Sequence, residues 1–254
     1  MSIDLKNVMA YQTWFYQLGK KTGQRLNKGR WLAKSLQGNT DQALEAEYLV
    51  GMAMANNIIN ENAHVDDVNI NAIIKETATP LLYRVKRKTR RFTFYVLDSK
   101  DINAFALPGG FIFMTIALLN KIGYDRHKMA FVMAHEMVHV LGRHPLKRIL
   151  ADYSVNFIAG LFKSKLVAGQ VAKQVVQDLL SKSYSRKNEL EADAFAVRLM
   201  YSSGYNAHEA PEALKIIDRN NNAGTKTLNY FATHPDLSTR LREMERVINR
   251  FSET

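Results

Sequence analysis

The five residues His135-Glu136-Met137-Val138-His139 decide how this sequence is interpreted. In an α-helix, residues four apart lie on the same face, so both histidines can direct a ring nitrogen at one metal ion. Glu136 lies beside that position, where its carboxylate can accept a proton from a metal-activated water. The pattern therefore predicts a zinc-binding helix, running from an N-cap at Asp125 to about residue 143, with His135 and His139 as ligands and Glu136 as general base.

A catalytic zinc ion usually has three protein ligands, and here the third cannot be a thiolate because the sequence contains no cysteine. His144 lies about 140° round a helix from the second histidine, so we exclude it as a ligand of the same ion. The segment at residues 185–193 (SRKNELEAD) offers Glu189 and Asp193 on one helix face, with Glu191 roughly opposite. Either Glu189 or Asp193 can bind the ion while the other hydrogen-bonds a ligand histidine, and the spacing alone leaves both assignments open.

The sequence on both sides of the motif predicts helices around a small sheet. We expect helices at residues 41–60, 184–202 and 235–251, and strands at 91–98, 102–107 and 111–115, the last two joined through Pro108-Gly109-Gly110. This order predicts one mainly helical α+β domain over residues 41–254, preceded by a basic, aromatic helical arm at residues 1–40.

Composition is that of an ordinary soluble protein, with 46% hydrophobic and 23% charged residues among 254. The formal net charge of +11 favours anionic partners. The arm at residues 1–40 is either an amphipathic segment lying on an anionic membrane surface or a packed helical hairpin. The basic run Arg84, Lys86, Arg87, Lys88 and Arg90 is either an anion-binding patch or an exposed strand edge protected against pairing.

Two further features of the sequence concern the cellular compartment of the protein. Residues 102–120 lack a charged side chain, but Asn103 and the Pro108-Gly109-Gly110 turn favour strands over a membrane-spanning helix. The first residues show no signal peptide, which predicts a cytoplasmic or peripheral membrane location; a processed fragment with an added methionine would instead be compatible with the periplasm.

Four segments, in this order along the chain, resemble the gluzincin zinc metallopeptidases of the HtpX and CAAX prenyl protease family (peptidase family M forty-eight). They are NAFALPGGFIF at residues 103–113, HEMVHVLGRH at 135–144, SRKNELEADAFA at 185–196, and Thr233-His234-Pro235 with Arg240. The resemblance spans roughly residues 40–250. It is strongest to the soluble or peripheral branch that includes the overlapping-activity mitochondrial peptidase and the β-barrel assembly-enhancing protease.

This resemblance implies a zincin-like fold, with the small mixed sheet beside the zinc-binding helix, one zinc ion per chain and a polypeptide substrate. It assigns Glu189 as the third ligand and Asp193 as the residue that orients a ligand histidine. Asn103, Ala104 and Phe105 would form the edge that pairs with an extended peptide. The substrates implied are misfolded or membrane-associated proteins.

The resemblance also places His234 close to the metal. There it would either steady the oxyanion of the tetrahedral intermediate or occupy the open zinc position as a latch. His64, His127, His144 and His208 receive no role. Two alternatives to an active peptidase stay open: a latent or chaperone-like zinc protein gated by His234, and a basic protein that binds membranes or nucleic acid. No nucleic-acid motif is present, so no nucleic-acid partner is expected, and the sequence does not predict an oligomeric state.

Overall fold

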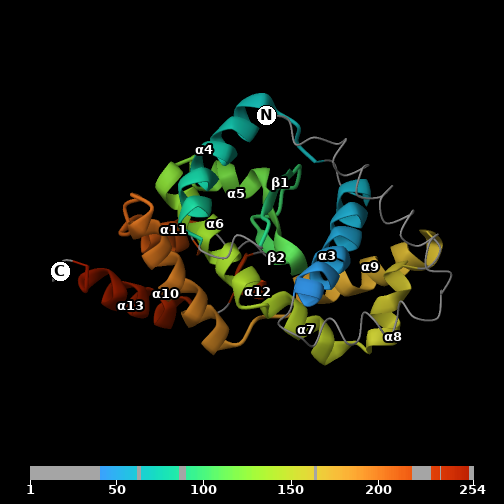
Figure 1. Ribbon diagram of the computed structural model, residues 1–254. Helices are drawn as coiled ribbons and strands as arrows, with labels where there is room; N and C mark the ends of the chain where they lie inside the picture. The colour runs from blue at the N-terminus through green and yellow to red at the C-terminus, as the bar shows by residue number, and fades with distance from the viewer. Residues whose placement is uncertain are drawn as a thin grey trace.

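The computed structural model describes residues 41–61, 64–85, 90–162, 165–218, 230–234 and 236–251, so the predicted arm at residues 1–40 lies outside it. The order of elements along the chain is shown in Figure 1. It is α3 (Asp41–Glu61), α4 (Val68–Arg84), β1 (Thr93–Leu97), β2 (Ala104–Leu107), η1 (Pro108–Gly110), β3 (Phe111–Thr115), α5 (Ile116–Lys121), α6 (Arg126–Leu141), α7 (His144–Asp152), α8 (Val155–Ile158), η2 (Ala159–Phe162), α9 (Lys165–Ser181), α10 (Arg186–Ser202), α11 (Glu209–Asp218), α12 (Tyr230–Thr233) and α13 (Leu237–Asn249).

The sheet has three strands in the order β1-β3-β2, with β3 in the centre. β3 runs parallel to β1 and antiparallel to β2, which makes the sheet mixed. Successive side chains of a strand point to opposite faces. Ile112 and Met114 accordingly join one hydrophobic cluster, whereas Phe111 and Phe113 join another. Because both faces are covered, every residue of β3 is buried.

The two clusters divide the helices between the two faces of the sheet. The first contains residues of α6, α10, α11 and α13, and the second contains residues of α3, α7 and α9. Figure 1 shows the same division, with α3 and α9 on one side of the strands and α10, α11 and α13 on the other. The predicted mainly helical α+β fold, with a small mixed sheet beside the helix that carries HEMVH, is therefore confirmed.

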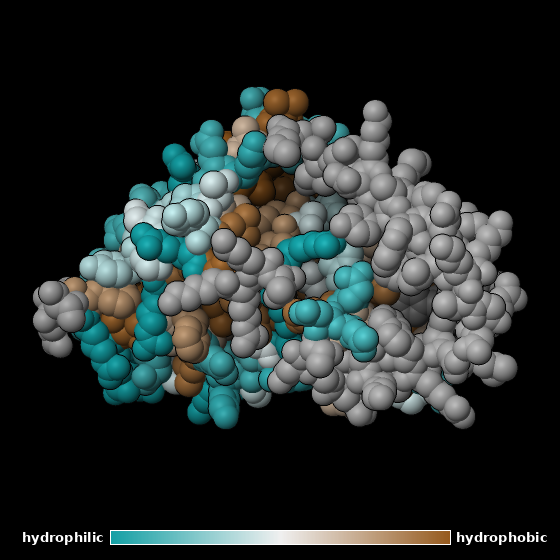
Figure 2. Space-filling view, in the orientation of Figure 1, coloured by the Kyte–Doolittle hydropathy of each residue, from teal (hydrophilic) through white to brown (hydrophobic). Residues whose placement is uncertain are grey.

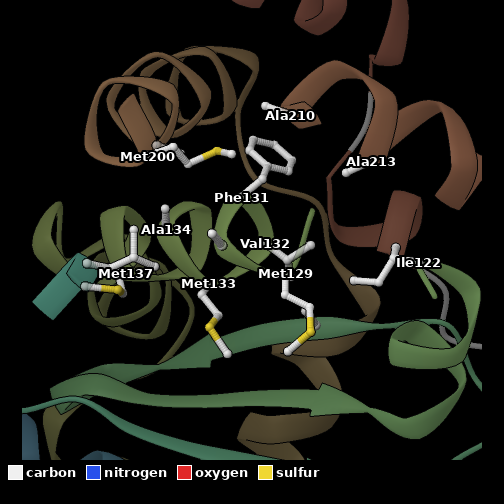
Figure 3. Packing of buried hydrophobic residues seen from close by; sticks show 14 of the residues in the cluster. Ile122, Met129, Phe131, Val132, Met133, Ala134, Met137, Met200, Ala210 and Ala213 are labelled. Carbon is white, nitrogen blue, oxygen red and sulfur yellow. The ribbon is translucent and has the colours of Figure 1, made fainter. Parts of the chain in front are cut away.

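Helix α6 is buried because it lies between the sheet and the C-terminal helices. In Figure 3, Met129 and Met133 point towards the strands, whereas Phe131 points towards Met200 and Ala210 on the other side. All five side chains are fully buried. Fully burying a side chain the size of Phe131 stabilises the fold by about 1.5–3 kcal/mol. This packing fixes the position of the helix that carries HEMVH.

Helix α3 packs directly on the turn between β2 and β3. Gly109 in that turn has φ +77°, a left-handed conformation that favours glycine. A Cβ atom at Gly109 would lie 2.4 Å from Cα of Tyr48 in α3, so only glycine permits this approach. The turn is thus fixed by backbone contact with α3.

One residue of the basic run before β1, Arg90, is not exposed as the sequence predicts. Lys86, Arg87 and Lys88 lie outside the described residues, but Arg90 is only 8% exposed and its Nη1 lies 2.7 Å from Glu47 Oε1. The interpretation of Arg90 as part of an exposed patch is wrong, because its guanidinium compensates a buried carboxylate instead.

The uncharged stretch at residues 102–120 forms β2, the turn, β3 and most of α5, as the turn residues predicted. Within the described ranges, no helix combines the length and hydrophobicity needed to cross a bilayer. Figure 2 shows a hollow below α4, at the place of the sheet, in which hydrophobic side chains are visible.

Candidate metal centre

The HEMVH residues lie on α6, which begins at an N-cap and ends at a glycine. Asp125 caps the helix by accepting hydrogen bonds from the backbone N–H groups of His127 and Lys128, each at 2.9 Å. At the other end, the N–H of Gly142 donates to the Val138 carbonyl. His135 and His139, four residues apart, are both fully buried and their Nε2 atoms are 3.0 Å apart. The two ring nitrogens therefore face one common point.

Helix α10 packs against α6 and brings the two predicted carboxylates to the histidines. Its N-cap is Ser185, whose hydroxyl accepts a hydrogen bond from the Asn188 N–H. Glu189 Oε1 lies 3.3 Å from His139 Nε2, and Glu189 Oε2 lies 3.7 Å from His135 Nε2. Glu189 thus shares the point that both histidines face.

Asp193 occupies a different position, behind the ring of His135. Its Oδ1 lies 2.9 Å from His135 Nδ1, the nitrogen that points away from the common point. A carboxylate at this distance favours the proton on Nδ1 and leaves the lone pair of Nε2 for a metal. The structure therefore distinguishes two acids that the spacing alone left equivalent.

Four donor groups of the described residues fit a metal ion. His135, His139, Glu189 and His234 each offer one atom, and these atoms lie within 4.8 Å of one another. Burial lowers the pKa of His139 well below its usual value, which keeps the ring neutral and able to donate a lone pair. A buried set of two or three imidazole nitrogens and one carboxylate suits zinc.

Glu136 lies beside this donor set and is not part of it. Its side chain is fully buried, and neither carboxylate oxygen has a hydrogen-bond partner among the described residues. Its Oε1 lies 3.4 Å from Nε2 of His234. Burial raises the pKa of the Glu136 carboxyl above its usual value, although His234 and His135 oppose this shift. A buried polar group without a partner is unusual and marks a position where a ligand is expected.

His234 reaches the same point from the segment at residues 230–234. Its Nδ1 lies 3.1 Å from each carboxylate oxygen of Glu189 and 3.3 Å from His135 Nε2. Its ring stacks on Tyr230, with centroids 4.5 Å apart. Backbone hydrogen bonds tie the segment to the rest of the fold: Tyr230 N–H donates to Ile102, and Tyr184 N–H donates to Thr233.

Arg240 of α13 holds the two acids and the His234 segment together. Its guanidinium donates to both oxygens of Asp193, at 2.7 and 2.8 Å, and to the carbonyl of His234 at 3.1 Å. Nη1 is also 3.2 Å from Glu189 Oε2. Although burial would raise the pKa of Asp193, Arg240 holds it below its usual value. The sequence pointed to Arg240 only as part of a motif, without this function.

Sequence reasoning missed two side chains that contact His139. His144 lies with its Nδ1 2.9 Å from His139 Nδ1, and the ring of Tyr184 stacks on His139 with centroids 4.2 Å apart. His144, to which the sequence assigned no role, therefore contacts His139 on the side of the ring away from the donor set. The 140° argument assumed one continuous helix, whereas Gly142 ends α6 before His144 begins α7. That glycine was the signal available in the sequence.

The predicted substrate residues lie at the edge of the sheet. Asn103 directly precedes β2, and its backbone faces β3, because its N–H donates to Thr115 Oγ1 and its carbonyl accepts from Thr115 N–H. Backbone polar groups alternate along a strand, so those of Ala104 and Ala106 point away from β3, although both residues are buried. The Ile102 carbonyl, two residues earlier, points the same way and accepts from Tyr230 N–H at 2.9 Å.

Known proteins similar to this chain include metalloendopeptidases. The chain is 30% identical over 157 residues to the mitochondrial metalloendopeptidase OMA1 of Schizosaccharomyces pombe, covering 61% of this chain and 46% of that protein. It is 28% identical over 171 residues to OMA1 of Danio rerio, covering 62% and 35%. It is 25% identical over 204 residues to a putative beta-barrel assembly-enhancing protease of Vibrio cholerae, covering 76% and 42%.

These alignments span about a third to a half of the length of the relatives. The sequence profile of Peptidase family M48 matches residues 66–248, which include α6, α10 and the His234 segment. Because this match covers well over half of the sequence, the chain belongs to Peptidase family M48, as its motifs predicted.

Proposed function

We propose that this chain is a zinc-dependent endopeptidase. The observation that carries the proposal is the convergence of His135, His139 and Glu189, from two helices, on one buried point with Glu136 beside it. A set of three such ligands with a neighbouring glutamate is the arrangement of catalytic zinc sites that hydrolyse peptide bonds. The names of the relatives, which include metalloendopeptidases, support the same reaction.

When bound, zinc would supply a Lewis acid that lowers the pKa of a coordinated water and neutralises charge on the substrate carbonyl. Glu136 would accept the proton of the attacking water and pass it to the leaving amine. A general base is most effective when its pKa lies near the working pH, and burial shifts the Glu136 carboxyl in that direction. Asp193 would keep His135 in the tautomer that donates Nε2.

The substrate would bind as an extended strand along the edge of β2. Main-chain hydrogen bonds to the outward-facing groups of Ala104 and Ala106 would supply affinity largely independent of sequence. Asn103 and Phe105 would act by shaping this edge, because their own backbone groups face β3. Relatives include a protease named for β-barrel assembly, so misfolded or membrane-associated polypeptides are the substrate class we would test first.

Replacing Glu136 with Gln tests the mechanism. We expect Glu136→Gln to keep its zinc and to lose casein cleavage by at least about a hundredfold, the typical contribution of a positioned base. Glu191→Gln is the matched control, because Glu191 is exposed on α10 and should leave both zinc content and cleavage unchanged. Undiminished proteolysis by Glu136→Gln would refute the assignment of the base.

A second candidate function, a latent peptidase, has a specific observation in its favour. His234 contributes a donor atom to the set, and a fourth protein ligand would close the position that a catalytic zinc site keeps open. The ring is fully buried, and its segment is tied to Ile102 and Tyr184. Cleavage would then require the segment at residues 230–234 to move away.

Replacing His234 with Ala separates the two roles. Latency predicts that His234→Ala cleaves casein faster than the wild type at equal zinc content. A role in steadying the oxyanion predicts slower cleavage with zinc retained. Activity that is unchanged or lost would therefore count against the latch.

A further inference from the structure

A buried carboxylate outside the HEMVH and NELEAD segments connects to the metal centre. Glu47 lies on α3, before the residues that the family profile matches, and it is fully buried. Its Oε1 accepts a hydrogen bond from Arg90 Nη1 at 2.7 Å and one from Gly109 N–H at 3.4 Å. Its Oε2 accepts from Arg143 Nε at 3.0 Å. One carboxylate thus joins α3, the lead-in to β1, the β2–β3 turn and the end of α6.

The second arginine partner, Arg143, lies in the turn that follows α6. Its φ is +56°, a left-handed conformation that costs energy in any residue with a Cβ atom. It lies between the glycine that ends α6 and His144, the first residue of α7. A turn of this kind persists only where surrounding contacts hold it. The hydrogen bond to Glu47 is such a contact.

This turn determines where His144 lies. A Cβ atom at Gly142 would lie 2.5 Å from His144 Nε2, so the imidazole folds back over the last turn of α6. In this position its Nδ1 is 2.9 Å from Nδ1 of His139. The nitrogen of His139 on the opposite side of the ring is the one that faces the donor set. A series of contacts therefore connects α3 to His139. Glu47 binds Arg143, the next residue in the chain is His144, and His144 contacts His139.

Burying Glu47 is costly unless its charge is compensated, and the fold compensates it with two guanidinium groups. The Arg90 contact joins α3 to the residues before β1. The Arg143 contact instead reaches the turn between α6 and α7.

We propose that Glu47 is a positioning residue of the metal site. Together with Arg143 it holds the turn that keeps His144 against His139, and so fixes the orientation of that ligand ring. Helix α3 is then a required part of the metal centre although it lies outside the matched region. The inference rests on the proposed zinc site but not on peptidase activity.

The test compares the two arginine contacts of Glu47 in the full chain. Arg143→Gln removes the contact to the turn after α6, Arg90→Gln removes the contact to the residues before β1, and Glu47→Gln weakens both. The zinc dissociation constant of each variant is measured by competition with a chelator. Met54→Ala, a fully buried site elsewhere on α3, is the control for general loss of α3 packing.

We expect Glu47→Gln and Arg143→Gln to weaken zinc binding by about tenfold, the lower end of the range for groups that orient ligands. The double variant should bind zinc about as weakly as either single variant, because both replacements act on the same contact between Glu47 and Arg143. Arg90→Gln and Met54→Ala should stay within about threefold of wild type, because no described contact joins either side chain to the turn at residues 142–144. In the metal-free protein, nitrogen NMR should show the tautomer equilibrium of His139 altered in Arg143→Gln and not in Arg90→Gln.

Wild-type zinc affinity in folded Arg143→Gln would overturn the inference while leaving the zinc site intact. Equal weakening in Arg90→Gln or Met54→Ala would also overturn it, because Glu47 would then act only through packing. If Glu47→Gln does not fold, Arg143→Gln still decides, because the Arg143 side chain keeps 16% of its surface exposed whereas that of Glu47 keeps 1%. A wild-type chain that binds no zinc would overturn both this inference and the proposed function.

Discussion

Replacing Arg240 with Met removes the cation that compensates the acids behind the metal centre. The Arg240 side chain is fully buried and makes two charge-assisted hydrogen bonds to Asp193 and one to the His234 carbonyl. Methionine fills much of the same volume but donates no hydrogen bond. Asp193 would remain buried without a guanidinium partner, which in other proteins costs about 3–5 kcal/mol.

This loss is large compared with the stability of a typical domain, about 5–15 kcal/mol. With an m-value of about 2 kcal/mol per molar urea, the midpoint of unfolding should fall by about 1.5–2.5 M. The measurement is urea unfolding followed by circular dichroism, in the presence of a chelator so that zinc binding does not add to the stability of the folded state.

Arg246→Met on the same helix is the matched control. The Arg246 side chain is 63% exposed and pairs only with Glu243 among the described contacts, so its loss should change stability by less than about 0.5 kcal/mol. In Arg240→Met combined with Asp193→Asn, the uncompensated charge is gone, and the double variant should be more stable than the sum of the single effects by about 1–3 kcal/mol. A loss below about 1 kcal/mol in Arg240→Met, or simple additivity, would refute the reasoning.

Two further predictions concern residues to which the sequence assigned no role. His144→Phe should weaken zinc binding about 10–100-fold, because it removes the group beside His139 Nδ1. His208→Phe, at an exposed histidine, should leave the zinc affinity unchanged, and equal affinities of the two variants would contradict a role of His144 in orienting His139. Tyr153 donates a hydrogen bond to Asp178, and burial together with this bond raises the pKa of Tyr153 to about 12. Because the pKa of this hydroxyl is higher in the folded protein, the hydroxyl stabilises the fold below about pH 10 and loses that effect as the pH rises towards 12. Tyr153→Phe should therefore lose less thermal stability than wild type between about pH 9 and 11. Identical losses in the two proteins would contradict this prediction.

Local patterns predicted much of the fold. The helix of HEMVH, the strands on both sides of Pro108-Gly109-Gly110 and the helix after Ser185 all occur close to the expected bounds. These elements are marked by caps, turn residues and apolar periodicity within a few residues, and such signals act locally. Arg90 was misinterpreted because a run of basic residues gives no indication of a carboxylate 43 positions away.

The sequence by itself determined the chemistry available to this protein. A separation of four residues on a helix brings His135 and His139 to one face, and the absence of cysteine restricts any further side-chain donor to His, Asp or Glu. Tertiary structure decided how these groups are used. The packing of α10 on α6 places Glu189 in the donor set and Asp193 behind His135, although the two acids lie on one helix face.

The same holds for the residues around the HEMVH helix. His234, Arg240 and Glu47 reach the centre from elements 45 to 99 residues away from the groups they contact, across distances that no sequence period describes. Their contacts depend on the angle at which helices cross and on which charges become buried together. Those quantities exist only once the chain has folded, which is why HEMVH predicted a metal site but not the network that orients it.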